Sequence, residues 1–198
     1  MDNWNTTLFL LINASDHPDA LVVLLATFFA DYLIVLVPVM LVIGWLRGDM
    51  VRRKLMLEAT ASGLFALLIN QAIGLVWQHP RPFMIGVGHT LIAHVADSSF
   101  PSDHLTLLLA VAFCFVLHKR WLVCGAILLA VSLPMAWARI YLGVHFPLDM
   151  VGAAVVACAS VAICHSVRRI IIEPIFVPVE RLYRWLFAPL IRRGWVGR

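Results

Sequence analysis

Charged side chains are scarce in this sequence, and their scarcity limits the kind of protein that it encodes. They make up 13% of the 198 residues, whereas hydrophobic residues make up 62%. Soluble domains contain about 25% charged residues on average. A large soluble core does not account for the difference, because the apolar residues form repeated uncharged runs of membrane-spanning length. The composition therefore predicts a single membrane domain over residues 1–198 and excludes an ordinary soluble protein.

Two further patterns are missing from the sequence. The cysteines lie inside apolar stretches and lack the paired spacing of zinc ligands, so we expect buried thiols. These cysteines are Cys114, Cys124, Cys158 and Cys164. The N-terminus carries Asp2 in place of a basic region, and no small-residue cleavage site follows its short apolar run. We therefore expect no cleavable signal peptide.

Apolar segments long enough to cross a membrane are the main feature of the sequence. A helix of about 20 residues covers a hydrocarbon core of about 30 Å, and backbone groups in lipid must bond within their own segment. The predicted spans are Leu21–Trp45, Leu55–Trp77, Ser102–Leu117, Trp121–Ala138 and Phe146–Cys164. The third is short, and we expect it to continue into the interface. The expected fold is an all-α, polytopic membrane helix bundle with five spans.

Both ends of the chain are predicted to lie at the membrane interface. The apolar run Leu8–Ile12 is too short to span, so we expect an interfacial or re-entrant helix there. The tail, residues 165–198, mixes arginines with Ile, Phe, Trp and Leu. Three prolines are expected to cut it into short pieces: Pro174, Pro178 and Pro189. This composition predicts interfacial helices on a charged, cytoplasmic membrane surface.

Positive charge sets the expected orientation, because loops rich in Lys and Arg stay in the cytoplasm. Thirteen of the fifteen cations fall in the first-to-second loop, the third-to-fourth loop and the tail, which alternating spans put on one face. They are Arg47, Arg52, Arg53, Lys54, Lys119, Arg120, Arg168, Arg169, Arg181, Arg184, Arg192, Arg193 and Arg198. Only Arg81 and Arg139 are left for the opposite face, which we expect to lie outside the cytoplasm.

Three segments carry reactive side chains to that outer face: His79–Pro82, Pro101–His104 and Arg139–Asp149. The planar fork of an arginine pairs with phosphate oxygens through two parallel hydrogen bonds. Ser102 and Asp103 open a helix, where free N–H groups and the helix dipole favour an anion. An ordinary helix N-cap is the alternative interpretation of Pro-Ser-Asp, and Ser102 is able to serve both purposes.

His145 and Asp149 form a candidate pair, because residues four apart share one face of a helix. Pro147 is tolerated in the first turn of such a helix. A carboxylate bonded to one ring nitrogen fixes the tautomer and leaves the other nitrogen free to attack. A structural bond and a metal site are the alternatives. The irregular histidine spacing, the few carboxylates and the lack of a helical His-x-x-x-His pair argue against a metal.

Together these segments resemble the type 2 phosphatidic acid phosphatase family, whose pattern is Lys-x6-Arg-Pro, Pro-Ser-Gly-His and Ser-Arg-x5-His-x3-Asp. The resemblance covers a catalytic core of about residues 55–164. The matching residues are Arg81, Pro82, Pro101, Ser102, His104, Arg139, His145 and Asp149. The departures are Gly74 for the lysine, Asp103 for the glycine and Ala138 for the serine. Without the lysine there is one phosphate clamp fewer, for which His79 or a water is the candidate replacement.

The Pro-Ser-Asp-His form is similar to that of bacterial undecaprenyl-diphosphate phosphatases of the bacitracin-resistance type, which regenerate the cell-wall lipid carrier outside the cytoplasm. The resemblance implies a bacterial inner-membrane enzyme that acts on a polyprenyl diphosphate without metal or cofactor. It also implies that His145 attacks the terminal phosphorus to form a phosphohistidine, and that Asp149 orients it. His104 protonates the leaving lipid phosphate and then activates water. The implied phosphate-binding residues are Arg81, Ser102, Asp103 and Arg139.

Other functions share these motifs and stay open. A phosphatase for another lipid phosphate, such as phosphatidylglycerol phosphate, or a lipid phosphotransferase would carry the same residues. A non-enzymatic transporter component belongs to another class and would have polar residues threading several spans at mid-depth, whereas most polar residues here collect at the outer ends. Nucleic acid is not an expected partner, and the oligomeric state is left open.

Several polar residues outside the motifs have less specific interpretations. Asp31 lies inside the first span, and an interior structural bond and a role in the lipid path are equally supported. Glu58, Asn70 and Gln71 in the second span are expected to bond to neighbouring helices. His89, His94 and Asp97 are expected in a solvated outer loop, with contact to the substrate headgroup as the alternative.

Overall fold

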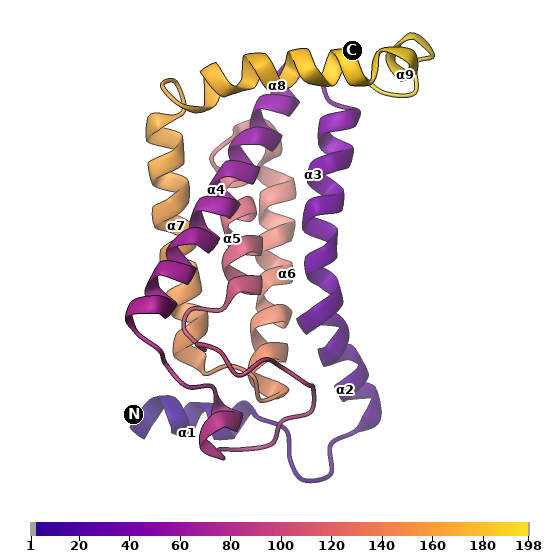
Figure 1. The fold of residues 1–198 in the computed structure, drawn as a ribbon. Coiled ribbons are helices and arrows are strands. Elements are labelled where there is room, and N and C mark those ends of the chain that lie inside the picture. The colour runs from indigo at the N-terminus through magenta and orange to yellow at the C-terminus, as the bar shows by residue number, and fades with distance from the viewer. Residues whose placement is uncertain (1–2, 198) are drawn as a thin grey trace.

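The computed structural model describes residues 3–197. Over these residues the chain forms helices and loops, with no β-strand among them. Long helical segments pack side by side, with α1 (Asn3–Ile12) across one end of the bundle and α8 (Ile172–Leu186) across the other (Figure 1). We call these the α1 end and the α8 end. The predicted all-α helix bundle is confirmed.

Four helical segments are long and apolar enough to cross a membrane. They are Ala20–Leu46, which joins α2 (Ala20–Thr27), η1 (Phe28–Tyr32), η2 (Leu33–Val35) and α3 (Leu36–Leu46); α4 (Met50–Val76); Lys119–Tyr141, which joins η4 (Lys119–Trp121) and α6 (Leu122–Tyr141); and α7 (Pro147–Val167). Large apolar side chains on these helices point outward, as at Leu24 and Leu64, which are 66% and 62% exposed. Such a surface is suited to lipid tails, so the chain is a membrane protein.

The remaining predicted span, α5 (Asp103–Val116), is shorter and lies in the core of the bundle against α4, α6 and α7. Its 14 residues would cover about 21 Å, less than a bilayer core of about 30 Å. Its neighbours bury it instead, with Leu108, Val111 and Cys114 almost fully enclosed. At Gly125 of α6 a side chain would collide with the backbone of α5, so the glycine permits this close packing.

Several helix boundaries differ from the expected ones. α4 begins at Met50 rather than at Leu55, because the Asp49 side chain caps the helix by accepting a 2.8 Å hydrogen bond from the Arg52 backbone N–H. Arg52, Arg53 and Lys54, which the sequence suggested for a loop, therefore lie in the first turns of α4. α6 continues to Tyr141, beyond the predicted end at Ala138. α7 begins at Pro147 and continues to Val167, beyond the predicted end at Cys164.

The N-terminal helix lies across the α1 end of the bundle, as expected for an interfacial helix (Figure 1). Phe9 is fully buried, and its ring meets the edge of Phe146 with 5.2 Å between centroids. The Asn5 side chain accepts a 3.1 Å hydrogen bond from the Leu148 backbone N–H. These contacts fix α1 against the start of α7, while Leu11 on its other face is 76% exposed.

The prediction that every proline breaks the tail is wrong. α8 runs through Pro174 and Pro178, and only Pro189 follows a helix end, at the start of α9 (Ala188–Arg192). Pro174 stands in the first turn, where the backbone N–H has no helical partner in any case. Pro178 costs one hydrogen bond, which the packing of α8 on the bundle offsets.

Arg53 of α4 supplies much of that packing. Its fully buried guanidinium donates to Glu180 at 2.8 Å, to the Tyr183 hydroxyl at 3.1 Å and to the Gly197 carbonyl at 2.8 Å. A buried guanidinium is stable only when its donors are satisfied in this way. Arg53 therefore fastens α8 and the residues after it to the bundle.

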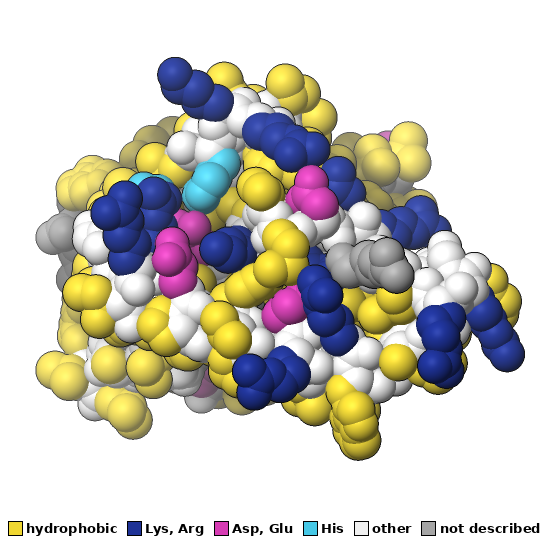
Figure 2. Space-filling view, turned by 90° about the horizontal axis from the view of Figure 1, so that it is seen from above, with side chains coloured by type: hydrophobic (Ala, Val, Ile, Leu, Met, Phe, Trp, Pro, Cys, Tyr) yellow, Lys and Arg dark blue, Asp and Glu magenta, His cyan; other side chains and the backbone are white. Residues whose placement is uncertain are grey.

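Lysine and arginine side chains gather on the face of the α8 end (Figure 2). Of the thirteen cations expected on one face, twelve stand at this end of the bundle in or beside α3, α4, η4, α8 and α9, and Arg198 lies outside the described residues. Arg81 and Arg139 stand at the α1 end. The bundle thus separates the cations between its ends as the sequence predicts.

Candidate active site

The candidate catalytic residues meet at the α1 end, where the loop from Trp77 to Ser102, the start of α5 and the turn between α6 and α7 come together. Gly143 makes that turn possible. Its φ is +81°, and a Cβ there would collide with the carbonyl oxygen of His89. The Asn13 side chain adds bonds of 2.6 and 2.9 Å to the backbone of His89 and 3.0 Å to Tyr141. The turn that carries His145 is therefore held rigidly.

His145 is buried, and each ring nitrogen has defined partners. Its Nδ1 lies 3.1 Å from Asp149, and its Nε2 lies 3.0 Å from the Arg81 guanidinium and 3.4 Å from that of Arg139. An ionised carboxylate only accepts hydrogen bonds, so Nδ1 carries the proton and Nε2 presents its lone pair to the arginines. Burial, reinforced by the charges of Arg139 and Arg81, holds the pKa of His145 well below its ordinary value. The imidazole is therefore neutral, as a nucleophile must be.

Asp149 both stabilises the start of α7 and orients the histidine. Its Oδ2 atom accepts from the Phe146 backbone N–H at 2.8 Å, from the Ser99 hydroxyl and from His145. A carboxylate in the first turn that reaches back to the N-cap N–H stabilises a helix start, and Pro147 suits the first position. His145 precedes α7, so the expectation that both residues lie on the helix is wrong. The pair meets because Asp149 reaches back from the first turn.

Each of the two arginines is paired with a carboxylate of its own. Arg81 donates to Asp97 at 2.8 Å and to the Val144 carbonyl at 2.9 Å. Arg139 donates to Asp31 at 3.1 Å. Both guanidinium groups are nearly fully buried. The two carboxylates offset the two positive charges and fix the forks on either side of His145 Nε2.

The pairing of Asp31 with Arg139 favours the first of its two interpretations, an interior structural bond. Asp31 lies in η1, a π-helical turn inside the first membrane segment. Such turns add one residue to the helix and are frequent at functional sites. Asp31 reaches the site arginine from this distorted turn.

Ser102 and Asp103 open α5, as predicted, but their side chains have different surroundings. Ser102 occupies the N-cap position without a capping bond, and its hydroxyl is buried and unpartnered among the described residues. Asp103 accepts from Asn70 at 2.8 Å and from Gln71 at 3.2 Å. Both amides belong to α4, so they hold the Asp103 carboxylate toward that helix. The Ser102 hydroxyl and the free N–H groups of the first turn remain available for an anion.

His104 stands in the first turn of α5 and is half-buried. It lies within range of electrostatic interaction with Arg139, His94 and Arg81. It also lies within range of electrostatic interaction with His145. Its imidazole has no hydrogen-bond partner among residues 3–197. It is thus within the same group of side chains and free to bond to a substrate.

The position of the family lysine is left as open space. A cavity of about 610 Å³ borders Gly74, His79, Asp103 and Asp97, the ion-pair partner of Arg81. A Cβ at Gly74 would touch only Ser98. His79 does not replace the lysine with another charge, because burial lowers the pKa of its imidazole. Its ring packs against Trp77 and Phe146, with centroids 5.4 and 5.8 Å away.

The loop makes contacts with the site that the sequence did not predict. Ser99 is fully buried and bonds to Asp149. His94 lies 3.1 Å from Arg139, and its ring centroid is 6.2 Å from that of His145. The solvated-loop interpretation is wrong for His94, while Asp97 is more than half exposed yet pairs with Arg81. His89 is half-exposed and bonds to Asp16 at 3.1 Å.

Comparisons with known proteins identify relatives of this chain. The chain is 36% identical to the putative undecaprenyl-diphosphatase YbjG of Escherichia coli K12, with 99% of this chain and 98% of the relative covered. It is 37% identical to the undecaprenyl-diphosphatase BcrC of Bacillus subtilis, with 77% and 78% covered. The crystal structure of LpxE from Aquifex aeolicus matches with a TM-score of 0.69 and 27% identity, over 82% of this chain and 95% of that one.

A family model covers the helices that build the site. The model of the PAP2 superfamily matches residues 55–172, which include α5, α6, α7 and most of α4. All the motif residues from Arg81 to Asp149 fall within the match. The chain belongs to the PAP2 superfamily.

Proposed function

We propose that this protein hydrolyses undecaprenyl diphosphate to undecaprenyl phosphate and inorganic phosphate. The observation that carries the proposal is the buried His145, with a carboxylate on Nδ1 and two guanidinium groups at Nε2. This arrangement supplies a neutral nucleophile beside a phosphate clamp. The choice of lipid rests on the two relatives named undecaprenyl-diphosphatase.

In the first step, His145 Nε2 attacks the terminal phosphorus and an N–P bond forms. The bond between that phosphorus and the bridging oxygen breaks, and His104 donates a proton to the leaving lipid phosphate. Asp149 keeps the Nδ1 proton in place and stabilises the positive charge that develops on the ring. In the second step, His104 takes a proton from water, which attacks phosphorus. The N–P bond breaks, and inorganic phosphate leaves.

The two arginines explain how a phosphate would enter this arrangement. Arg81 Nη1 and Arg139 Nη2 both approach Nε2, at 3.0 and 3.4 Å. A terminal phosphate that takes over these donors would present its phosphorus to the lone pair of Nε2. The Ser102 hydroxyl and the first N–H groups of α5 are further donors for its oxygens. Such fixed donors act most strongly on the charge that develops in the transition state.

The proposed location is the bacterial inner membrane, with the site outside the cytoplasm. Twelve described cations at the α8 end support this orientation, because positive charge stays on the cytoplasmic side. An outward-facing site would regenerate the cell-wall lipid carrier where the carrier diphosphate is released. Faster recycling would also remove the diphosphate that bacitracin binds, so bacitracin resistance is part of the proposal.

A transporter component is the different-class alternative, and the core of the bundle argues against it. Leu108 and Val111 of α5 and Ala153 and Ala157 of α7 are buried and apolar at mid-depth. Charged side chains gather toward the two ends instead, and the buried polar groups at mid-helix are hydroxyls such as those of Ser62 and Ser132. The substrate is tested with purified protein by measuring phosphate release from undecaprenyl diphosphate and from phosphatidylglycerol phosphate. We expect a higher kcat/KM for the diphosphate; a preference for phosphatidylglycerol phosphate would overturn the substrate assignment.

A further inference from the structure

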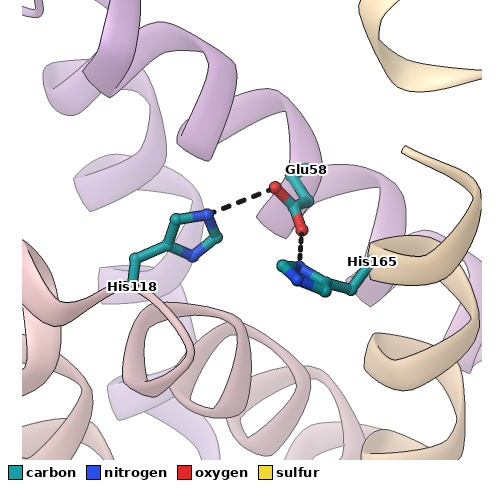
Figure 3. Close-up of side chains that lie close together, drawn as sticks. All are labelled: Glu58, His118 and His165. Atoms are coloured by element: carbon teal, nitrogen blue, oxygen red, sulfur yellow. Dashed lines mark hydrogen bonds and ion pairs between the residues drawn. The ribbon is translucent and has the colours of Figure 1, made fainter. Parts of the chain in front are cut away.

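A second group of ionisable side chains lies at the α8 end, away from the proposed catalytic residues. Glu58 of α4, His118 of the turn after α5 and His165 in the last turn of α7 converge there (Figure 3). Along α7, His165 is about 24 Å from Asp149, at about 1.5 Å per residue. The proposed mechanism uses none of these three residues, so their arrangement needs its own explanation.

The three side chains are placed as metal ligands are. Glu58 is 5% exposed, and its two oxygens point to different histidines: Oε1 lies 2.8 Å from His165 Nδ1 and Oε2 lies 3.5 Å from His118 Nε2. The three ligand atoms lie within 4.8 Å of one another. Ligands at about 2.0 Å from a tetrahedral zinc ion stand about 3.3 Å apart. A small movement of the three side chains toward an ion would bring all three ligand atoms into bonding distance.

The hydrogen bond on the other side of His118 supports a cation between the ligands. His118 Nδ1 lies 2.9 Å from the Cys114 carbonyl, which only accepts, so Nδ1 carries a proton. Nε2 then faces a buried carboxylate oxygen 3.5 Å away, so the positive charge between them is either a proton on Nε2 or a bound cation. A backbone carbonyl on the far nitrogen is also the usual way in which a zinc-bound histidine is oriented.

The surroundings leave room for an ion and a further ligand. A cavity of about 260 Å³ borders Glu58 and His118 and has Glu173 on its wall. Lys54 also lines this cavity, with its ammonium 5.5 Å from the centre of the Phe176 ring. Arg168 is the competing charge, because its Nη1 lies 3.1 Å from the ligand atom His165 Nδ1 and 3.0 Å from His165 Nε2. Arg168 would have to move aside when a cation binds.

We infer that Glu58, His118 and His165 form a binding site for a first-row divalent cation, with zinc the best match to two imidazoles and one carboxylate. The site joins α4, α7 and the turn between α5 and α6. Glu173, at the start of α8, is the candidate fourth ligand. A bound ion would tie the helix ends of the bundle to α8, and its role is structural rather than catalytic.

The test uses full-length protein without a histidine tag, stripped with a chelator in detergent. Zn²⁺ titration by calorimetry should give one ion per chain and raise the melting temperature, and Co²⁺ should give the visible absorption of a tetrahedral site. His118→Ala and His165→Ala should each weaken Zn²⁺ binding more than about 100-fold, beyond the loss of an outer partner. Arg168→Ala should tighten binding severalfold. His17→Ala, at an exposed histidine, is the matched control and should bind like the wild type.

Absence of stoichiometric binding to the wild-type protein would overturn the inference, and so would equal binding to the His118→Ala/His165→Ala double variant. Either result would make the cluster an ion-pair network held by a proton. Phosphate release at the distant catalytic end reports whether each variant is folded. If a histidine variant loses phosphate release, Glu58→Gln, which keeps the side-chain shape, replaces it in the Zn²⁺ titration. The wild-type titration decides the matter even if every variant fails to fold.

Discussion

Replacing Asp149 by asparagine separates two roles of this carboxylate, orientation of His145 and stabilisation of its positive charge. The Phe146 N–H and the Ser99 hydroxyl both donate to Oδ2, so the amide oxygen of an asparagine should take that place. It could then still accept from His145 Nδ1, and the tautomer would be kept. The amide nitrogen would occupy the place of Oδ1, which has no partner among the described residues. Asp149→Asn should therefore remove the charge and little else.

The size of the loss follows from the distance. His145 Nδ1 and Asp149 Oδ2 are 3.1 Å apart. Unit charges about 4 Å apart attract by about 4 kcal/mol at an effective dielectric constant of about 20. Since about 1.4 kcal/mol corresponds to a tenfold change in rate, kcat for Asp149→Asn should fall about 1000-fold. The melting temperature should change little, because the variant buries one charge fewer but leaves its amide N–H groups without a partner.

Single-turnover rates and melting temperatures of three variants test this reasoning. Asp149→Ala should lose more activity than Asp149→Asn and should also melt lower, because it leaves buried donors unpaired at about 1–3 kcal/mol each. Ser99→Ala is the matched control, and it should lose at most about 1.5 kcal/mol, or about tenfold in rate. If Asp149→Asn stays within threefold of the wild type, the charge is not needed. If Asp149→Asn loses as much activity as Asp149→Ala, the amide nitrogen rather than the amide oxygen faces His145 Nδ1, and the tautomer is lost.

Three further predictions concern the membrane, the metal and the pH profile. In a variant without native cysteines, a cysteine at Val95 should react with an impermeant thiol reagent outside whole cells and one at Lys119 should not; the opposite pattern would put the site in the cytoplasm. Phosphate release should survive EDTA, since the residues around His145 form an arginine–histidine phosphate site. Full loss with recovery on adding one divalent ion, seen also in the His118→Ala/His165→Ala variant that lacks the proposed zinc ligands, would contradict this. Burial lowers the pKa of His145 below the ordinary histidine value of 6.5, so the imidazole stays neutral at pH values below 6.5. The acidic limb of the kcat/KM profile should therefore lie below pH 6.5, and a limb above pH 6.5 would contradict a buried neutral histidine.

Much of the architecture follows from the sequence because the membrane imposes simple rules. Uncharged runs predicted the helices, and the split of arginines and lysines between the loops predicted the two ends of the bundle. The motif spacing predicted that Arg81, Arg139 and His145 would meet. Their convergence requires the loop after α4 and the turn before α7 to lie at the same end, which follows once the spans alternate.

The features of the site that the sequence did not reveal are long-range side-chain contacts. His94 and Ser99 lie in a loop without helical or strand periodicity, so nothing in their spacing indicates that they reach Arg139 and Asp149. Asp31 pairs with an arginine 108 positions away through a distorted helical turn. At Pro178 the sequence led to a wrong prediction. Local propensity predicts a helix break there, whereas the packing around Arg53 keeps α8 intact.

The roles of the two histidines are tested most directly by rapid-quench trapping of protein-bound phosphate from substrate labelled in its terminal phosphate. The wild-type protein should accumulate an acid-labile, base-stable phosphoprotein, as a phosphohistidine requires. His145→Ala should form none, while His104→Ala should still form it and turn over slowly, with the mildest loss on a substrate whose leaving group needs little protonation. If His145→Ala accumulates the phosphoprotein and His104→Ala does not, the roles of nucleophile and general acid must be exchanged, and the mechanism proposed for His145 is wrong.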